Sequence, residues 1–336
     1  MSSLAADFPV LDFTKFKSDF QSFSDELFAA STKWGFFVLR GTGISSDGMF
    51  GLSRQFFDLP VQEKTSKLLN EQSIGYDGKT VTTWAASEGM TFGTNPGGIL
   101  TTEHLPEWWD QHRREQVEEF KAQCYNLSID LLSCFAVQLG LDKNYFLRYH
   151  EHREPGNNLK LIRYPPMKEQ PGQGVPRLAE HTDWGSITFV FTKQGGLEIR
   201  DPHDNWLQVP VVEDGIVVNI GDALSLWTGK ALKSTMHRIT WEGLPKDKNR
   251  YSIAYFINPN YDAVLNPSKD PSAIAELNTE LTYRDYYQLR LRLTYAIQDT
   301  KTGQQLEGDI DSSTLALVNK LNVANRGTIE SHMIKA

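Results

Sequence analysis

Two histidines and an aspartate in the second half of the chain could together hold a metal ion. His181-Thr182-Asp183 lies at the end of a segment that we expect to be a strand, and His237 lies at the end of another. Two imidazoles and one carboxylate on adjacent strands would form a facial triad, which leaves three positions of an octahedral metal open for a co-substrate and dioxygen. This ligand set favours Fe(II). A bare His-x-Asp also occurs on strands that bind no metal, so the surrounding residues have to decide between the two interpretations.

Arg250 and Ser252 could also bind a ligand, and they alternate along the strand expected after His237. Because side chains alternate between the two faces of a strand, both should point to the same face. An arginine can clamp a carboxylate with two hydrogen bonds, and a serine hydroxyl can add another donor. The distal carboxylate of a dicarboxylate co-substrate needs such a group. Considered alone, the pair could equally be a surface arginine beside a strand serine.

The first half of the chain predicts short strands mixed with helices. Residues 70–103 are rich in Gly, Thr, Asn and Ser and lack sustained periodicity, so we expect loops there. Apolar runs predict strands at 9–13 and 35–39, and apolar spacings of three and four predict helices over about 16–28, 46–57 and 110–139.

After Leu159 short β-branched and aromatic runs recur, separated by turn signals such as Gly195-Gly196. Many short strands at this spacing are typical of a sandwich or a barrel. Strands are expected at 160–164, 186–191, 197–200, 206–209, 216–220, 223–227, 235–241 and 251–257, and a helix around 283–293.

The size and composition of the chain indicate an ordinary globular protein. With 336 residues, of which 40% are hydrophobic, it can bury a sizeable core, and we expect a single domain over 1–336. Its parts would be a helix-rich region at 1–158, a β core at 159–260, and a C-terminal helical region with a tail at 261–336.

Charge and cysteine content exclude several kinds of partner. A net charge of −8 without clustered Lys and Arg argues against nucleic acid or an anionic membrane surface, and no apolar run is long enough to span a membrane. Cys124 and Cys134 would lie about 15 Å apart along one helix, which makes them a poor disulfide pair. We expect a cytoplasmic protein that acts on a small molecule and has no obligate protein partner.

One long segment makes a family resemblance specific. Asn219-Ile-Gly-Asp-Ala-Leu-Ser-Leu-Trp-Thr-Gly-Lys-Ala-Leu-Lys-Ser-Thr-Met-His-Arg-Ile239 resembles the isopenicillin N synthase-like 2-oxoglutarate oxygenases. Residues 181–188 are similar to the first-ligand motif of that family, 195–199 to the strand that follows it, and Arg250-Tyr-Ser252 to its co-substrate motif. Residues 9–13 and 34–37 resemble its amino-terminal signature, so the resemblance extends over about 9–290.

The resemblance implies a fold, a reaction and several site residues. The fold is mainly β with flanking helices around a distorted double-stranded β-helix, a jelly-roll variant. His181, Asp183 and His237 would bind Fe(II), and O2 would oxidise the organic substrate while 2-oxoglutarate is decarboxylated to succinate. Tyr164 matches a tyrosine that often contacts 2-oxoglutarate, beside Arg250 and Ser252. Ile162 stands where the family often has Asn.

Four residues are candidates for the substrate pocket. Phe256 resembles the position where relatives place a ring against the substrate, and Tyr76, Thr91 and Phe92 lie in the region that shapes their pockets; packing into the core is the alternative for these residues. The resemblance suggests specialised metabolism and leaves hydroxylation, desaturation and oxidative cyclisation or rearrangement open. Members that use ascorbate, or that form rings without 2-oxoglutarate, also carry Arg-x-Ser. A non-catalytic jelly-roll binding or sensor protein is the competing hypothesis, and succinate formation from 2-oxoglutarate would discriminate the two.

Overall fold

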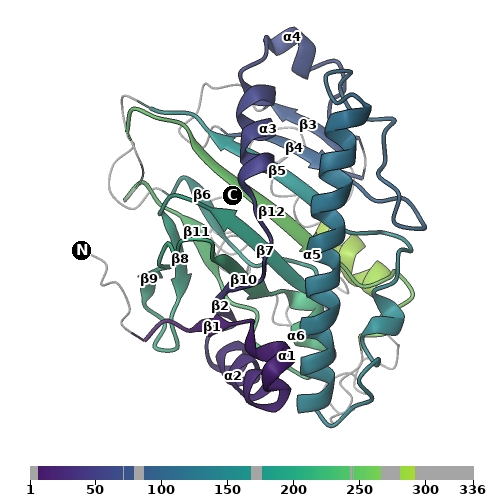
Figure 1. Ribbon diagram of the computed structural model, residues 1–336, viewed down its shortest axis with the longest axis vertical. Coiled ribbons are helices and arrows are strands. Elements are labelled where there is room, and N and C mark those ends of the chain that lie inside the picture. Colours follow the sequence, from purple (N-terminus) through teal and green to yellow (C-terminus); the bar gives the residue numbers. More distant parts are fainter. Residues whose placement is uncertain are drawn as a thin grey trace, which may run out of the picture.

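Two β-sheets and a layer of helices make up the protein (Figure 1). The structure, a computed structural model, describes residues 7–70, 72–78, 87–167, 176–242, 244, 246–265 and 281–291. The long helix α5 (Gln111–Gln138) crosses the larger sheet, with α3 (Asp47–Phe57) beside it and α2 (Phe20–Lys33) near its far end. Shorter helical segments are α1 (Lys15–Ser18), α4 (Val61–Lys64), α6 (Asp222–Trp227) and a 3-10 turn at Leu147–Tyr149.

The mostly antiparallel strands of the two sheets have the arrangement of a jelly roll, which confirms the predicted fold class. The larger sheet has eight strands in the order β1 (Val10–Asp12), β2 (Phe36–Arg40), β10 (Ile216–Ile220), β7 (Ile187–Thr192), β12 (Arg250–Ile257), β5 (Asn158–Tyr164), β4 (Glu88–Phe92) and β3 (Gly75–Gly78). The smaller sheet has the order β6 (Leu178–His181), β11 (His237–Ile239), β8 (Leu197–Arg200) and β9 (Trp206–Gln208), at the left of Figure 1. Only β1 and β2 pair in parallel among these strands.

The two faces of the large sheet bury two different cores. Ile253, Tyr255 and Ile257 of β12 belong to the core beneath α2, α3 and α5. The other face, represented by Phe36 and Val217, shares a second core with residues of the smaller sheet. Each strand serves both cores because its side chains alternate between its faces. Residues at the intervening positions of β12 therefore look into the space between the sheets.

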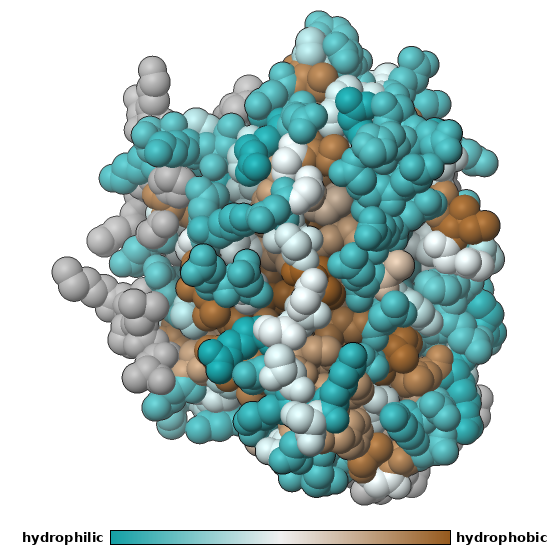
Figure 2. Space-filling view, viewed as in Figure 1, coloured by the Kyte–Doolittle hydropathy of each residue, from teal (hydrophilic) through white to brown (hydrophobic). Residues whose placement is uncertain are grey.

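The helical layer is covered outside by polar side chains. In Figure 2 this face is largely hydrophilic, and apolar side chains gather beside α5 where the helices meet the sheet. None of the described helices is long and apolar enough to span a membrane. Cys124 and Cys134 are both buried in α5 and form no disulfide.

Two predictions of secondary structure were wrong. Residues 223–227, expected as a strand, lie in the helix α6, because a short apolar run fits either structure. Residues 75–78 and 88–92, expected as loops, form β3 and β4 at the edge of the large sheet. All five residues of β4 are buried, and Glu88 and Gly89 limit the alternation of apolar and polar residues to Met90, Thr91 and Phe92, which is too short to indicate a strand.

The remaining elements agree with the prediction to within a few residues. The last described segment contains a helix at 283–291, which we name the C-terminal helix. The predicted end of that helix and the tail lie outside the described residues. The N-terminal region supplies β1 to β4, so it is joined to the later strands within one sheet.

Candidate metal and co-substrate site

The three predicted metal ligands lie together beside the paired ends of β6 and β11 in the smaller sheet. His181 ends β6, His237 begins β11, and the two residues are directly paired across these strands. Nε2 of His181 lies 3.9 Å from Oδ1 of Asp183, and Nε2 of His237 lies 3.8 Å from the same oxygen. Among the described residues these are the group whose ligand atoms, all within 4.8 Å of one another, could hold a metal ion.

Backbone carbonyls orient both imidazole rings. Nδ1 of His181 lies 2.8 Å from the carbonyl oxygen of Ala179, and Nδ1 of His237 lies 3.2 Å from that of Thr235. A ring that donates its Nδ1 proton to a carbonyl keeps a lone pair on Nε2. Both rings can therefore direct an Nε2 lone pair at a metal ion placed between them and Oδ1 of Asp183.

In the carboxylate of Asp183, Oδ2 accepts a hydrogen bond from a neighbouring side chain, and Oδ1 faces the two histidines. Asn219 of β10 donates from Nδ2 to Oδ2 of Asp183 at 2.8 Å. Burial would raise the pKa of the Asp183 carboxyl, but His237, His181 and hydrogen bonds from Thr188 and Asn219 outweigh it and keep the pKa below its usual value. The carboxylate is therefore ionised at neutral pH.

The protonation state of His181 also suits a metal. The side chain of His181 remains 32% exposed, yet partial desolvation, together with the neighbouring His237 ring, lowers its pKa to about 4. Its imidazole is therefore neutral at pH 7. Metal binding requires a neutral imidazole and an ionised carboxylate, and a set of two nitrogens and one oxygen fits Fe(II).

Arg250 and Ser252 lie on the face of β12 that looks into the space between the sheets. Arg250 is paired with Tyr164 of β5, and its guanidinium lies 5.2 Å from the centre of that ring. It is 2% exposed, and Nε donates to the carbonyl of Gly195 at 3.0 Å. Burial lowers the pKa of Arg250, yet a guanidinium stays charged at neutral pH.

One nitrogen of Arg250 is left for a ligand. Its Nη1 is buried and has no hydrogen-bond partner within the described part of the chain. A buried charged donor without a partner is costly, so the site fits a carboxylate that would accept from it. Burial raises the pKa of the Tyr164 phenol, which therefore remains a neutral hydroxyl able to donate to the same group.

Phe256 and Thr91 share this inner face. Phe256 is paired with Thr188 of β7, which donates a hydrogen bond to Asp183. Thr91 of β4 is paired with Lys160 of β5, which is in turn paired with Ala254 of β12. Since directly paired residues point to the same face, Thr91 and Lys160 belong to the face that carries Ser252 and Phe256.

Tyr76 and Phe92 are not brought to the site. Tyr76 is paired with Met90, and Met90 and Phe92 alternate with Thr91 along β4, so all three face the helices. The Phe92 ring lies 4.7 Å from Trp109, centre to centre, and the Tyr76 ring 6.0 Å from Phe56. Because 88–92 is a strand, the side chains of Thr91 and Phe92 point to opposite faces of the sheet. Tyr76 and Phe92 pack into the core beneath the helices.

Three residues near the site escaped the sequence analysis. Asn219 stands at the start of the segment that carries the resemblance, but nothing in the sequence pairs it with Asp183. Thr188 of β7 hydrogen-bonds Asp183, which lies five residues earlier in the turn before that strand, and the sequence does not reveal how this turn folds back. Lys160 could have been found, because it alternates with Ile162 and Tyr164 along one strand; its Nζ lies 3.8 Å from Oδ2 of Asp77.

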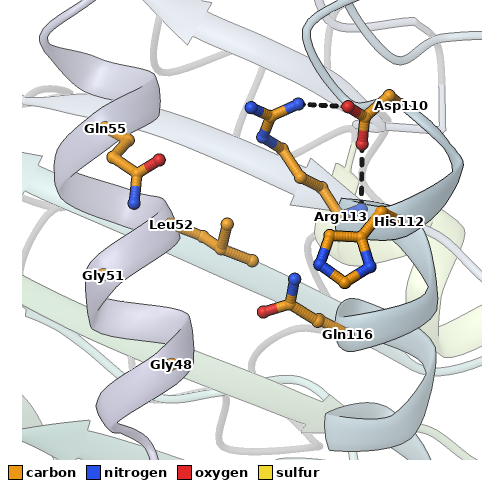
Figure 3. Close-up of a pocket in the computed structure, with 8 residues that line it drawn as sticks. All are labelled: Gly48, Gly51, Leu52, Gln55, Asp110, His112, Arg113 and Gln116. Carbon is orange, nitrogen blue, oxygen red and sulfur yellow. Dashed lines mark hydrogen bonds and ion pairs between the residues drawn. The ribbon is translucent and has the colours of Figure 1, made fainter.

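A separate hollow of about 420 Å³ lies in the helical layer, between α3 and the start of α5. In Figure 3, Arg113 reaches to the carboxylate of Asp110, while Gln55 and Gln116 extend from the two helices toward the space between them. The helices that form it cover the outer face of the large sheet, opposite to the inner face that carries Arg250. We assign no part of the metal chemistry to it.

Sequence comparisons match two family models that follow one another along the chain. Residues 142–259 match the 2OG-Fe(II) oxygenase superfamily, and residues 8–117 match the N-terminal region of non-haem dioxygenases in morphine synthesis. The proline hydroxylase buaE of Petromyces alliaceus is 30% identical over 85% of this chain and 98% of its own. The 2-oxoglutarate-dependent dioxygenase tropC of Talaromyces stipitatus is 28% identical over 77% of this chain and 87% of its own.

The fold has solved counterparts. A full-length Neurospora crassa protein, crystallised in complex with alpha-KG (2-oxoglutarate) and thymine, is 28% identical and superimposes with a TM-score of 0.74, covering 88% of this chain and 100% of that one. The family uses Fe(II), 2-oxoglutarate and O2, and the His-Asp-His group and the buried Arg250 fit the first two of these. The chain therefore belongs to the 2OG-Fe(II) oxygenase superfamily and is a 2-oxoglutarate-dependent non-haem iron dioxygenase.

Proposed function

We propose that this chain, working as a single oxygenase domain, oxidises a small organic substrate at an iron held by His181, Asp183 and His237. The observation that carries the proposal is the convergence of these three ligand atoms within 4.8 Å. Bound Fe(II) supplies the oxidising chemistry, with O2 as oxidant and 2-oxoglutarate converted to succinate and carbon dioxide. The direct test is Fe(II)-dependent succinate formation from 2-oxoglutarate in air, measured with and without candidate substrates.

The chain itself would bind and orient the reactants. Arg250, Ser252 and Tyr164 would hold the distal carboxylate of 2-oxoglutarate through the guanidinium and two hydroxyls. Apolar residues of the second core surround Tyr164 and continue into the smaller sheet, where they exclude water from this end of the site. Asn219 would keep Asp183 turned so that Oδ1 remains available to the metal.

Ser252→Ala should weaken the binding of 2-oxoglutarate modestly. The substitution removes one hydrogen bond, which contributes about 1 kcal/mol, so half-saturation should need about fivefold more 2-oxoglutarate. Succinate formation at varied 2-oxoglutarate concentration measures this. Ser128→Ala is the control, because Ser128 is also buried but lies in α5, on the other side of the large sheet. An unchanged requirement in Ser252→Ala would remove the hydroxyl from the proposed clamp.

We further propose that the organic substrate lies on the inner face between Phe256, Thr91 and Lys160. These positions lie on the face of the large sheet that carries Ser252, and Phe256 is paired with Thr188, which hydrogen-bonds Asp183. A relative named proline hydroxylase and the Neurospora crassa protein bound to thymine support a substrate of amino-acid or nucleobase size. We place the reaction in specialised metabolism and leave open whether it is hydroxylation, desaturation or ring formation.

Phe256→Ala should separate 2-oxoglutarate consumption from substrate oxidation. The ring would fix the substrate's reacting carbon near the metal, and small displacements abort the substrate step. Both succinate and oxidised product should be quantified, with proline, thymine and a library of small acids and heterocycles as substrates. We expect the ratio of product to succinate to fall in Phe256→Ala.

Phe92→Ala is the matched control for Phe256→Ala. It removes an equal ring from the opposite face, so it should lower the melting temperature through a core cavity while keeping the product-to-succinate ratio. A ratio that falls in Phe92→Ala and stays constant in Phe256→Ala would place the pocket on the helical side of the sheet.

A further inference from the structure

The carboxylate of Asp222, at the start of α6, collects four hydrogen bonds from three distant segments. Its Oδ2 accepts from Thr182 Oγ1 at 2.9 Å, from the Tyr286 hydroxyl at 2.7 Å and from Arg290 Nη1 at 2.6 Å. Its Oδ1 accepts from Ser234 Oγ at 2.5 Å. The group is buried: Asp222 is 8% exposed, and Tyr286 and Arg290 are each 1% exposed.

Two of these three segments carry the proposed metal ligands. Thr182 stands between His181 and Asp183, and Ser234 precedes His237 by three residues. The backbone NH of Asp222 also donates to the carbonyl of Asp183 at 2.8 Å. One residue that belongs to neither segment thus connects the segment of His181 and Asp183 to the segment of His237.

The third segment is the C-terminal helix, which supplies Tyr286 and Arg290. The Arg290 guanidinium also lies 5.2 Å from the centre of the Trp184 ring, and Tyr287 places its ring 5.7 Å from the same tryptophan. Trp184 directly follows Asp183 in the chain. The C-terminal helix therefore contacts the metal-ligand segment twice, once through Asp222 and once through Trp184.

The backbone around Asp222 leaves little room for these segments to shift independently. A Cβ added to Gly221 would lie 2.2 Å from the carbonyl oxygen of Gly185, so the turns before Asp222 and after Asp183 touch directly. Gly221 also donates from its NH to the carbonyl of Ser186 at 2.9 Å. A displacement of Asp222 would therefore be transmitted to the turn that holds Asp183.

We propose that Asp222 and its partners Arg290 and Tyr286 are positioning residues of the metal centre, through which the C-terminal helix fixes the spacing of the two ligand-bearing segments. The inference rests on the proposed ligands His181, Asp183 and His237. In this arrangement the two oxygens of Asp222 accept from Arg290, Thr182 and Ser234 together, so one side chain ties both ligand-bearing segments to the C-terminal helix. None of these groups needs to touch the metal.

Asp222→Asn and Arg290→Gln test the proposal, with metal affinity as the readout. Affinity of the apoprotein is measured by anaerobic titration with Fe(II) and with Co(II), whose visible absorption reports the ligand geometry, and the melting temperature is measured in parallel. Outer residues that orient metal ligands typically change affinity by about 10- to 100-fold. We expect a loss of that size and an altered Co(II) spectrum in both variants, with partial recovery in Arg290→Lys.

Glu88→Gln is the matched control. Glu88 forms another buried ion pair, with its carboxylate 3.0 Å from Lys64 Nζ and side chains 9% and 2% exposed, on the face of the sheet toward the helices. This variant should lose thermal stability and keep the metal affinity and Co(II) spectrum of the parent chain. If it loses metal affinity as much as Asp222→Asn does, the effect is general destabilisation and the proposal fails.

Milder variants keep the test decisive if Asp222→Asn does not fold. Ser234→Ala and Tyr286→Phe each remove one hydrogen bond to Asp222 and should each weaken metal binding with little change in melting temperature. Unchanged affinity and spectra in all folded variants would overturn the proposal. His181→Ala tests the ligand assignment separately from the positioning role of Asp222. If His181→Ala binds metal like the parent chain, the ligand assignment is wrong. If His181→Ala loses metal while the Asp222 variants bind it normally, only the positioning role is rejected.

Discussion

Asp183→Ala is expected to abolish Fe(II)-dependent turnover while leaving the fold intact. Asp183 supplies the one carboxylate of the proposed donor set, and its Oδ1 lies 3.9 Å and 3.8 Å from the two imidazole Nε2 atoms. Two imidazoles alone hold Fe(II) weakly, since the metal prefers a mixed set of nitrogen and charged oxygen ligands. Succinate formation and anaerobic Fe(II) titration should both show the loss, and His181→Ala and His237→Ala should behave in the same way.

Two surface substitutions provide the comparison. His203 and Asp262 are exposed and lie outside the site, so His203→Ala and Asp262→Ala should keep the metal affinity of the parent chain. Circular dichroism and melting temperature should show that the three ligand variants remain folded. Full activity of any ligand variant at limiting iron would remove that residue from the proposed triad.

Side-chain placement was predicted best where the candidate site residues all lie on one face of a strand. The alternation of Arg250 and Ser252 was enough to place both on one face, and the pairing with Tyr164 agrees with the family motif. The same rule would have included Lys160, four residues before Tyr164 on the same strand. Short-range periodicity is thus informative wherever a strand has two chemically different faces.

Periodicity gave no guide where both faces of a strand are buried. In β4 the alternation covers only Met90, Thr91 and Phe92 because Glu88 and Gly89 precede it, so the segment was not recognised as a strand. Thr91 and Phe92 were therefore grouped although they point in opposite directions. In α6 the apolar residues are too few for the helical period to be distinguished from a buried strand. Both errors arise at edges of the site, where neighbours far along the chain decide the conformation.

Contacts between distant segments could not be predicted at all from one sequence. The hydrogen bonds that converge on Asp222 join Thr182, Ser234 and the C-terminal helix, and no spacing links these positions. The Asn219 contact to Asp183 is of the same kind. The ligands of a metal are recognisable from their residue types, whereas the groups that orient the ligands depend on the fold.

Arg250→Lys is expected to produce the largest change in co-substrate binding. The buried Nη1 of Arg250 has no partner among the described residues, and Nε is already held by Gly195. Lysine keeps the charge but offers a compact ammonium on a different stem, which cannot reproduce the planar fork of a guanidinium. Since a hydrogen bond to a charged group contributes about 1.5–3 kcal/mol, half-saturation should require about 10- to 150-fold more 2-oxoglutarate.

Arg163→Lys is the matched control for this prediction. Arg163 is on the strand next to β12, adjacent to Tyr164, but it faces the helices and donates to Glu88 at 2.6 Å. Its replacement should lower stability and leave the requirement for 2-oxoglutarate unchanged. Direct binding of 2-oxoglutarate to the Fe(II)-loaded protein under anaerobic conditions separates affinity from turnover in both variants. Equal affinities in Arg250→Lys and the parent chain would mean that another cation holds the distal carboxylate, and Arg177, whose guanidinium lies 5.4 Å from the centre of the same Tyr164 ring, would be the next to replace.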